Sequence, residues 1–178
     1  EGFDTVGLEQ KHRGKIADEQ LEVITRLWTE DNVTHEGRFF KLYNVTVDPK
    51  PVQKPYPPIW IGGRTASIPR AARFAEVLDP PWPSRDEVRT VYIPRLNEAS
   101  AKWDRKTKMG GWYYACVREN GMSSASINDW FGELMAQEIG VTPAELAIAG
   151  SPSECAAKAR AYMEPGVAHF VLDFQAHA

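Results

Sequence analysis

The four residues Gly62-Gly63-Arg64-Thr65 could bind an anion, and they directly follow the apolar triplet Ile59-Trp60-Ile61. Two glycines let a ligand approach the backbone N–H groups, and a helix that starts nearby adds partial positive charge. The guanidinium of Arg64 can form paired hydrogen bonds with a phosphate, while Thr65 or Ser67 can donate a hydroxyl. The pattern therefore predicts a phosphate site. The alternative is that the glycines only form a tight turn and that Arg64 is a solvated side chain.

The elements on either side of this loop would hold it rigidly. Proline fixes φ and disfavours helix in the residue before it, so residues 49–58 are predicted to be extended. Residues 59–61 then predict a short strand buried on both faces, which is typical of parallel sheets. A helix is expected after the loop, with Ser67 as its N-cap and Pro69 in its first turn.

The rest of the chain alternates between strand and helix patterns. Before the loop, a helix that Asp18 or the loop before it can cap, and a β-hairpin arm near residues 33–47, are expected. After the loop, strands are expected at 75–78, 111–117 and 167–174. Helices are expected to start at Ser84, with an interruption at Pro94, and at Ser151, with a capping box. Two further helical segments are expected at 125–138 and 142–146. This order predicts an α/β fold with four parallel strands and right-handed crossovers, and a single domain over residues 1–178.

Composition excludes several classes of protein. The 178 residues are 43% hydrophobic and 25% charged, which is enough for one globular domain with a core. The net charge of -3 and the lack of a basic stripe argue against nucleic acid as a partner. The sequence contains no run of about 18 apolar residues, so it does not predict a membrane span. No secretory h-region is found, so a cytoplasmic location is expected.

Cysteine and histidine usage does not indicate a metal site. The two cysteines, Cys116 and Cys155, lack metal-ligand spacing and are expected to be buried thiols. The four histidines are scattered along the chain, without a ligand motif. Five aromatic residues lie between positions 103 and 130. They could line a substrate pocket, although core packing is the commoner role for Trp103, Trp112, Tyr113, Tyr114 and Trp130.

Three segments resemble the luciferase-like monooxygenases, and together they span most of the chain. They are LWTEDNVTHEGRFF at 27–40, PKPVQKPYPPIWIGG at 49–63 and GSPSECAAKARAYMEPGVAHFVLDF at 150–174. The resemblance implies a (β/α)8 barrel and a flavin- or deazaflavin-dependent oxidoreductase that acts on a small organic molecule. The cofactor would be flavin mononucleotide (FMN) or the deazaflavin coenzyme F420. By this resemblance the loop at Gly62, Gly63, Arg64 and Thr65 contacts the cofactor phosphate.

The chain departs from the family pattern in two ways. The usual Asp-Gly-Trp after the helix that follows the glycine pair is replaced by FAEVLDPPWPS at 74–84, which contains Asp79 and Trp82 in another order. The chain is also shorter than the roughly 200 residues that a complete barrel needs. The matching segments correspond to the second half of the barrel. The first half, which in the family holds much of the ring pocket and commonly a catalytic histidine, is missing, so no catalytic residue is predicted. His169, in the closing strand, is expected to be a packed or rim residue.

Half a barrel would expose two strand edges and an apolar inner face. We therefore expect the chain to pair with a second copy or with an N-terminal half, or to be a piece of a longer protein. The main hypothesis is an oxidoreductase of this family, here represented by its C-terminal half. The alternative is a non-catalytic half-barrel that binds a cofactor or self-associates. An unrelated phosphate-binding α/β protein is a third, weaker reading.

Overall fold

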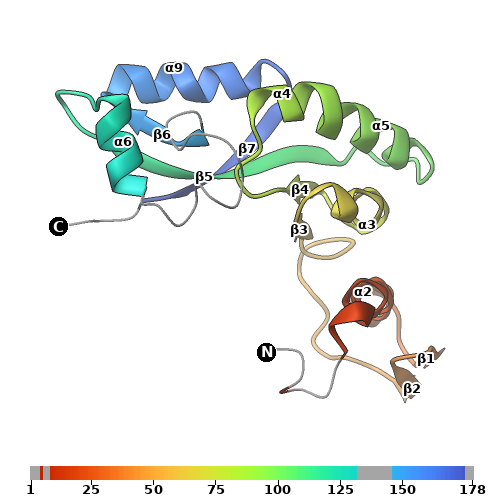
Figure 1. Ribbon diagram of the computed structural model, residues 1–178. Coiled ribbons are helices and arrows are strands. Elements are labelled where there is room, and N and C mark those ends of the chain that lie inside the picture. The colour runs from red at the N-terminus through yellow and green to blue at the C-terminus, as the bar shows by residue number, and fades with distance from the viewer. Residues whose placement is uncertain (1–4, 6–8, 132–145, 175–178) are drawn as a thin grey trace. The chain divides into compact units, whose positions relative to one another are not determined.

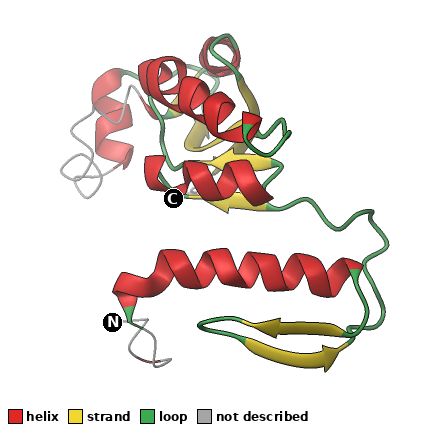
Figure 2. Cartoon of the chain, turned by 90° about the vertical axis from the view of Figure 1, so that its right-hand side faces the viewer, coloured by secondary structure: helices red, strands yellow, loops and turns green. Residues whose placement is uncertain are grey.

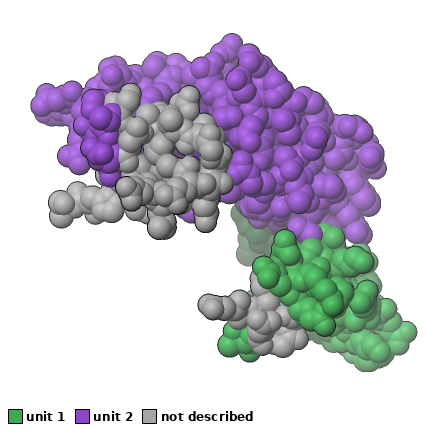
Figure 3. All heavy atoms as spheres, viewed as in Figure 1, with its two compact units in different colours: residues 1–58 green, residues 59–178 purple. Residues whose placement is uncertain are grey.

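A computed structural model describes residues 5, 9–131 and 146–174. By its internal contacts the chain divides into two compact units, residues 1–58 and residues 59–178, which Figure 3 distinguishes by colour. The organisation of residues 1–178 as one domain stays a prediction.

The first unit contains one long helix and a hairpin. The short 3₁₀ turn η1 (Gln10–His12) leads into α2 (Arg13–Thr29), and β1 (Val33–Glu36) pairs antiparallel with β2 (Lys41–Val45). Figure 2 shows the hairpin alongside the helix. The predicted hairpin arm is thus confirmed.

Of the two predicted caps, Asp18 is wrong, because α2 begins five residues earlier, at Arg13, and Asp18 lies inside the helix. Ile16 explains the difference. It lies two helical turns before Val23, and these two are the buried residues of α2, so the extra turn adds an apolar contact on the same face.

The proline tract is less regular than predicted. Residues 49–58 form neither helix nor strand, but they bend through 52–57 and contain a cis peptide bond between Lys54 and Pro55. Lys50 fastens the start of the tract to the end of α2. Its ammonium donates to the carbonyl of Leu27 at 3.1 Å and to that of Glu30, and it pairs with Asp31 at 3.0 Å. A cation at a helix C-terminus satisfies free carbonyls and complements the helix dipole.

The second unit contains a sheet of five strands, all of whose pairings are parallel. The long strand β5 organises it, because β5 pairs with β4 at its start, with β7 along its middle and with β6 at its end, while β3 pairs with β4. The strands are β3 (Trp60–Gly62), β4 (Val77–Asp79), β5 (Lys108–Val117), β6 (Ile148–Gly150) and β7 (Val167–Asp173). The predicted α/β class with a parallel sheet is confirmed.

The prediction of four strands missed β6. Its three residues, Ile-Ala-Gly, are all buried and stand directly before the N-cap of the next helix, so no alternating pattern marks them. The other four strands lie within a few residues of their predicted positions.

Helices follow the strands as expected. The turn η2 (Thr65–Ser67) precedes α3 (Ile68–Phe74). After β4, α4 (Arg85–Glu87), the π-helical turn η3 (Val88–Tyr92) and α5 (Ile93–Ala101) form a continuous run, and the π-helical turn ends just before the predicted interruption at Pro94. Next come α6 (Ser124–Phe131) and α9 (Pro152–Met163). Residues 132–138 and 142–145, also predicted helical, lie outside the described residues.

Helix caps were predicted with mixed success. The capping box at Ser151 is present, with the Ser151 hydroxyl and the Glu154 carboxylate each accepting the backbone N–H of the other residue. Ser67 is the N-cap residue of α3 by position, as predicted, but it has helical backbone angles and its side chain makes no cap hydrogen bond. The 3₁₀ turn of residues 65–67 leads directly into α3.

The two faces of the sheet differ. Figure 1 shows α4, α5 and α9 along one side of the strands. The side chains on that side include the buried Tyr113, whose ring centroid lies 4.6 Å from that of Tyr162 in α9. The opposite face carries partly exposed side chains such as Trp60, with 44% of its surface exposed, and Val171, with 37%. We call this second side the open face.

Candidate functional site

The predicted phosphate loop forms a tight, backbone-lined turn at the carboxyl end of β3. Gly63 has φ of +115°, and a Cβ at this position would lie 2.4 Å from the Ser67 hydroxyl oxygen. A Cβ at Gly62 would meet nothing closer than the Asp79 carbonyl at 3.7 Å. The turn therefore needs glycine at position 63, whereas at position 62 the missing side chain leaves open space beside the backbone.

The helix contributes less to this loop than predicted. The N–H of Ser67 donates to the Arg64 carbonyl at 2.8 Å, which closes the 3₁₀ turn and uses that amide internally. The following helix, α3, has only seven residues. The groups offered to an anion are therefore the exposed loop backbone, the Arg64 guanidinium and the hydroxyls of Thr65 and Ser67.

Arg64 is held in place rather than freely solvated. Its Nη2 donates to Oε1 of Glu87 at 3.1 Å, and 45% of the Arg64 side chain is exposed. The other oxygen of Glu87 accepts the Ser84 N–H at 2.9 Å, while the Ser84 hydroxyl accepts the Glu87 N–H. The carboxylate of Glu87 thus joins the loop after β3 to the start of α4. Glu87 was not predicted as a site residue, although Ser84 and Glu87 have the spacing of a capping box.

A row of residues crosses the open face at the level of the loop. Gly62 of β3 is in register with Asp79 of β4, and Gly110 of β5 is in register with His169 of β7. A Cβ at Gly110 would lie 2.9 Å from Asp79 Oδ1, so Asp79 and Gly110 are neighbours on the same face. The His169 ring also contacts the Trp60 ring, at 5.2 Å between centroids. The expectation that His169 is a packed residue agrees with this contact.

Within this row, Asp79 is a residue whose surroundings shift its pKa. Its Oδ1 is shielded from solvent and has no hydrogen-bond partner among the described residues. Burial raises the pKa of Asp79, and the nearby His169 acts in the opposite direction. Sequence reasoning noted Asp79 only as part of an altered motif, because its position between two glycines depends on strand register.

Three aromatic rings extend the open face toward the carboxyl end of the sheet. The rings of Trp82, Trp112 and Tyr114 contact one another with centroid distances of 5.2 to 5.9 Å. All three are partly exposed, in contrast to the fully buried Tyr113. The aromatic residues therefore divide between the partly exposed open face and the core. Trp103, half exposed, lies instead against Arg73.

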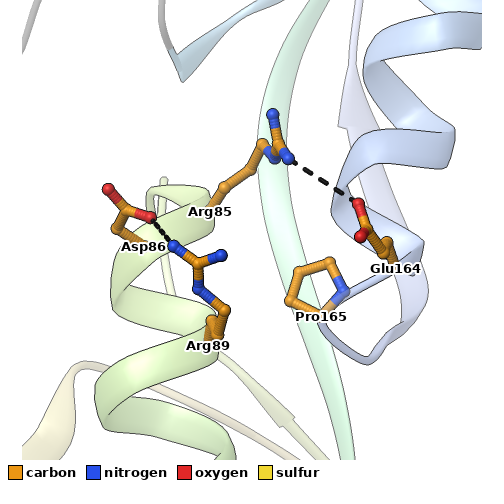
Figure 4. Close-up of a pocket in the computed structure, with 5 residues that line it drawn as sticks. All are labelled: Arg85, Asp86, Arg89, Glu164 and Pro165. Carbon is orange, nitrogen blue, oxygen red and sulfur yellow. Dashed lines mark hydrogen bonds and ion pairs between the residues drawn. The ribbon is translucent and has the colours of Figure 1, made fainter.

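A shallow pocket elsewhere in the second unit is less suited to a ligand. It is lined by Arg85, Asp86, Arg89, Glu164 and Pro165 (Figure 4). Both arginines face carboxylates, at 3.8 Å from Arg85 to Glu164 and 2.7 Å from Arg89 to Asp86. These charged side chains are more than half exposed, so the pocket is a solvated set of ion pairs.

The described part of the chain has neither a metal-ligand cluster nor a membrane-spanning helix. Within residues 5, 9–131 and 146–174, no three His, Cys, Asp or Glu side chains are grouped as a metal site would require. In the same residues, no helix has the length and apolar character needed to cross a bilayer.

Known proteins with similar sequences share part of this chain. The FMNH(2)-dependent dimethylsulfone monooxygenase of Pseudomonas putida is 36% identical to this chain over 66 residues. The aligned segment covers 37% of this chain and 17% of that protein. The likeness is therefore confined to a short shared segment.

Solved structures share the fold over nearly the whole chain. An F420-dependent secondary alcohol dehydrogenase, in complex with an F420-acetone adduct, matches with a TM-score of 0.75 and 17% identity over 93% of this chain and 57% of its own. The monooxygenase RslO1 from Streptomyces bottropensis matches with a TM-score of 0.72 and 21% identity over 99% of this chain and 58% of its own. The chain thus spans somewhat more than half the length of these structures.

The sequence itself determines the family. The family model of the luciferase-like monooxygenases matches residues 2–123, which include α2, the hairpin, the glycine loop and all of β5. This match covers more than half of the 178 residues. The chain belongs to the luciferase-like monooxygenase family.

Proposed function

We propose that this chain is the cofactor-phosphate-binding half of a flavin- or deazaflavin-dependent oxidoreductase. The observation that carries the proposal is the loop after β3, where Gly63 at φ +115° is followed by an arginine that Glu87 holds in place. The loop supplies open backbone, a guanidinium and two hydroxyls, a donor set that suits a phosphate group. Gly62, Gly63, Arg64 and Thr65 are the proposed contacts.

The similar proteins support two cofactors. One relative is named as FMNH(2)-dependent, and one structure as F420-dependent. FMN and coenzyme F420 both attach a phosphate to a ring through a polyhydroxyl ribityl chain, so one phosphate loop can serve either. When bound, such a cofactor supplies oxygen activation or hydride transfer, and the protein supplies orientation and shielding from water.

The residues of this chain would hold one end of that cofactor. Arg64 and the loop backbone would fix the phosphate, and the open face of the sheet would lie beside the rest of the molecule. The aromatic rings of Trp82, Trp112 and Tyr114 offer an apolar wall to a small organic substrate. No catalytic residue is proposed from the phosphate end alone.

The rest of the site would come from outside these 178 residues. We propose that the open face is completed by an N-terminal barrel half or by a second copy of the chain. A cytoplasmic location is also proposed, supported by the free thiols of Cys116 and Cys155. The alternative, a non-catalytic half-barrel that binds cofactor or self-associates, predicts binding and assembly without turnover.

Titration of the purified chain with FMN and with coenzyme F420 tests the proposal, using fluorescence as the readout. Saturable binding that weakens in Arg64→Ala, but not in a matched variant of the exposed Arg95, would support the phosphate site. Binding that is equally strong in Arg64→Ala would contradict it. The mass of the chain in solution, with and without cofactor, reports whether a second copy completes the face.

A further inference from the structure

Asp79 stands between two glycines on the open face. Gly62 lies beside it in β3, in register, and Gly110 lies beside it in β5, where a Cβ would come within 2.9 Å of Asp79 Oδ1. Both neighbours lack side chains, so the carboxyl group of Asp79 lies between two stretches of bare backbone. On the Gly110 side Oδ1 occupies the space that a side chain would need, whereas on the Gly62 side the space beside the backbone is open, so a ligand can approach the carboxyl group from Gly62.

The carboxyl group lacks the partners that a structural role would require. Oδ1 is shielded from solvent and accepts no hydrogen bond from any described residue. Burial raises the pKa of Asp79 against the opposing effect of His169 in β7, and the Asp79 charge contributes in turn to the raised pKa of the buried Tyr113 hydroxyl in β5. An acceptor of this kind is costly in the free protein and is satisfied when a ligand brings a donor.

The position of Asp79 indicates which part of a ligand it would meet. Adjacent strands lie about 4.8 Å apart, so Asp79 is one strand away from Gly62, the first residue of the proposed phosphate loop. The ligand group next to the phosphate therefore reaches Asp79 first. In FMN and in coenzyme F420 this group is the ribityl chain, whose hydroxyls are hydrogen-bond donors.

We propose that Asp79 is a further cofactor-binding residue, whose carboxylate accepts hydrogen bonds from the ribityl hydroxyls. The inference rests on the proposed function, because it takes the phosphate to lie at Gly62 and Arg64. It adds a second contact with different chemistry. Arg64 recognises the phosphate, whereas Asp79 recognises the polyol, which is present in riboflavin as well.

This difference gives a direct test with FMN and riboflavin as the two probes, titrated into the purified chain. Asp79→Asn is expected to weaken both probes by the same factor, about tenfold. Arg64→Ala is expected to weaken FMN and leave riboflavin unchanged. Asp173→Asn is the matched control, because Asp173 is a carboxylate in β7 that is in register with Tyr114, away from the loop.

Each result decides a different claim. Unchanged binding of both probes to Asp79→Asn, together with a loss of FMN in Arg64→Ala, would overturn the inference and leave the proposed function intact. A loss in Asp79→Asn with no effect of Arg64→Ala would support the polyol contact and contradict the phosphate loop. Failure of the wild-type chain to bind either probe would overturn both.

Stability of the free protein provides a second readout. Asp79→Leu, which removes an unpaired acceptor and keeps a similar shape, is expected to raise the urea midpoint while it abolishes riboflavin binding. A lowered midpoint in both Asp79→Leu and Asp79→Asn would show that Asp79 supports the fold, and would overturn the inference.

The pH dependence has a definite sign. A raised pKa in the folded state means that wild-type stability is highest with Asp79 protonated and declines as pH rises through that pKa. Riboflavin affinity should change in the opposite sense, falling as pH drops and the carboxylate is lost. Asp79→Asn should show neither change, with His169 and Tyr113 still present; an unaltered pH profile in this variant would contradict the proposal.

Discussion

The Arg64 guanidinium lies 3.1 Å from the Glu87 carboxylate and thereby joins the loop after β3 to the helix that follows β4. Glu87 makes two contacts: one carboxylate oxygen pairs with Arg64, and the other completes the capping box with Ser84. The contact with Arg64 is partly exposed, so its own contribution to stability is small. Its larger consequence is electrostatic, since a carboxylate beside Arg64 reduces the positive charge that the loop presents to an anion.

Replacing Glu87 with glutamine should therefore alter phosphate binding selectively. Glutamine can occupy the same place in a capping box, so the cap is kept while the negative charge next to Arg64 is removed. We expect Glu87→Gln to increase FMN affinity about two- to fivefold at low salt and to leave riboflavin affinity unchanged. Parallel titrations of the two ligands measure the ratio.

Ser84→Ala is the matched control for Glu87→Gln. It removes the hydroxyl that accepts the Glu87 N–H and leaves the carboxylate that pairs with Arg64. It should lower the free energy of unfolding by about 1 kcal/mol without changing the ratio of FMN to riboflavin affinity. Weaker FMN binding in Glu87→Gln would mean instead that Glu87 matters by orienting Arg64.

The two loop glycines should respond differently to alanine. Gly63 has φ of +115° and a Cβ there would lie 2.4 Å from the Ser67 oxygen, so Gly63→Ala should cost about 1–3 kcal/mol of stability. Gly62→Ala meets nothing closer than 3.7 Å and should leave stability nearly unchanged. Urea denaturation compares them. Adding Ser67→Ala to Gly63→Ala should restore only part of the loss, because the backbone strain remains; equal stability of the two glycine variants would refute this account of the turn.

The fold could be predicted where the pattern is local. The hairpin, the parallel strands and the Ser151 cap follow from residues that are adjacent or a turn apart. The start of α2 and the strand β6 could not, since the first depends on the burial of Ile16 and the second has only three residues.

The candidate site also contains a part that could be predicted from local sequence and a part that could not. The loop at residues 62–65 is contiguous and was found from its composition. The partner of Arg64, Glu87, lies 23 residues away, in the helix after β4. Asp79, Gly110 and His169 meet only through the register of three strands, which sequence periodicity does not fix when the strands are short. Charge pairs and register contacts of this kind require the three-dimensional structure.

The cap at Ser151 should contribute measurably to the second unit. Its hydroxyl accepts the Glu154 N–H at 3.3 Å, and the Glu154 carboxylate accepts the Ser151 N–H at 2.7 Å. Ser151→Ala should lower the free energy of unfolding by about 1 kcal/mol, measured by urea denaturation. Ser126→Ala, on the exposed surface of α6, is the comparison; an equal loss there would show that the effect is not specific to the cap.

In the first unit, the Glu19 carboxylate fastens the hairpin to α2. It accepts the backbone N–H groups of Phe40 at 2.8 Å and Phe39 at 3.0 Å, and lies 3.3 Å from the His35 ring nitrogen. Burial acts to raise the pKa of Glu19, but these hydrogen bonds outweigh it, so the pKa lies below its ordinary value.

A lowered pKa in the folded state means that the Glu19 contacts stabilise the unit above the unfolded-state pKa of glutamate and are lost as pH falls through the lower folded value. Glu19→Gln should therefore loosen the hairpin at neutral pH and remove this acid transition. The NMR amide shifts of Phe39 and Phe40, followed through the acidic range, measure it. Glu30→Gln, which removes an exposed partner of Arg26 from the end of the same helix, should keep the transition. A transition that persists in Glu19→Gln would assign the pH dependence to another group.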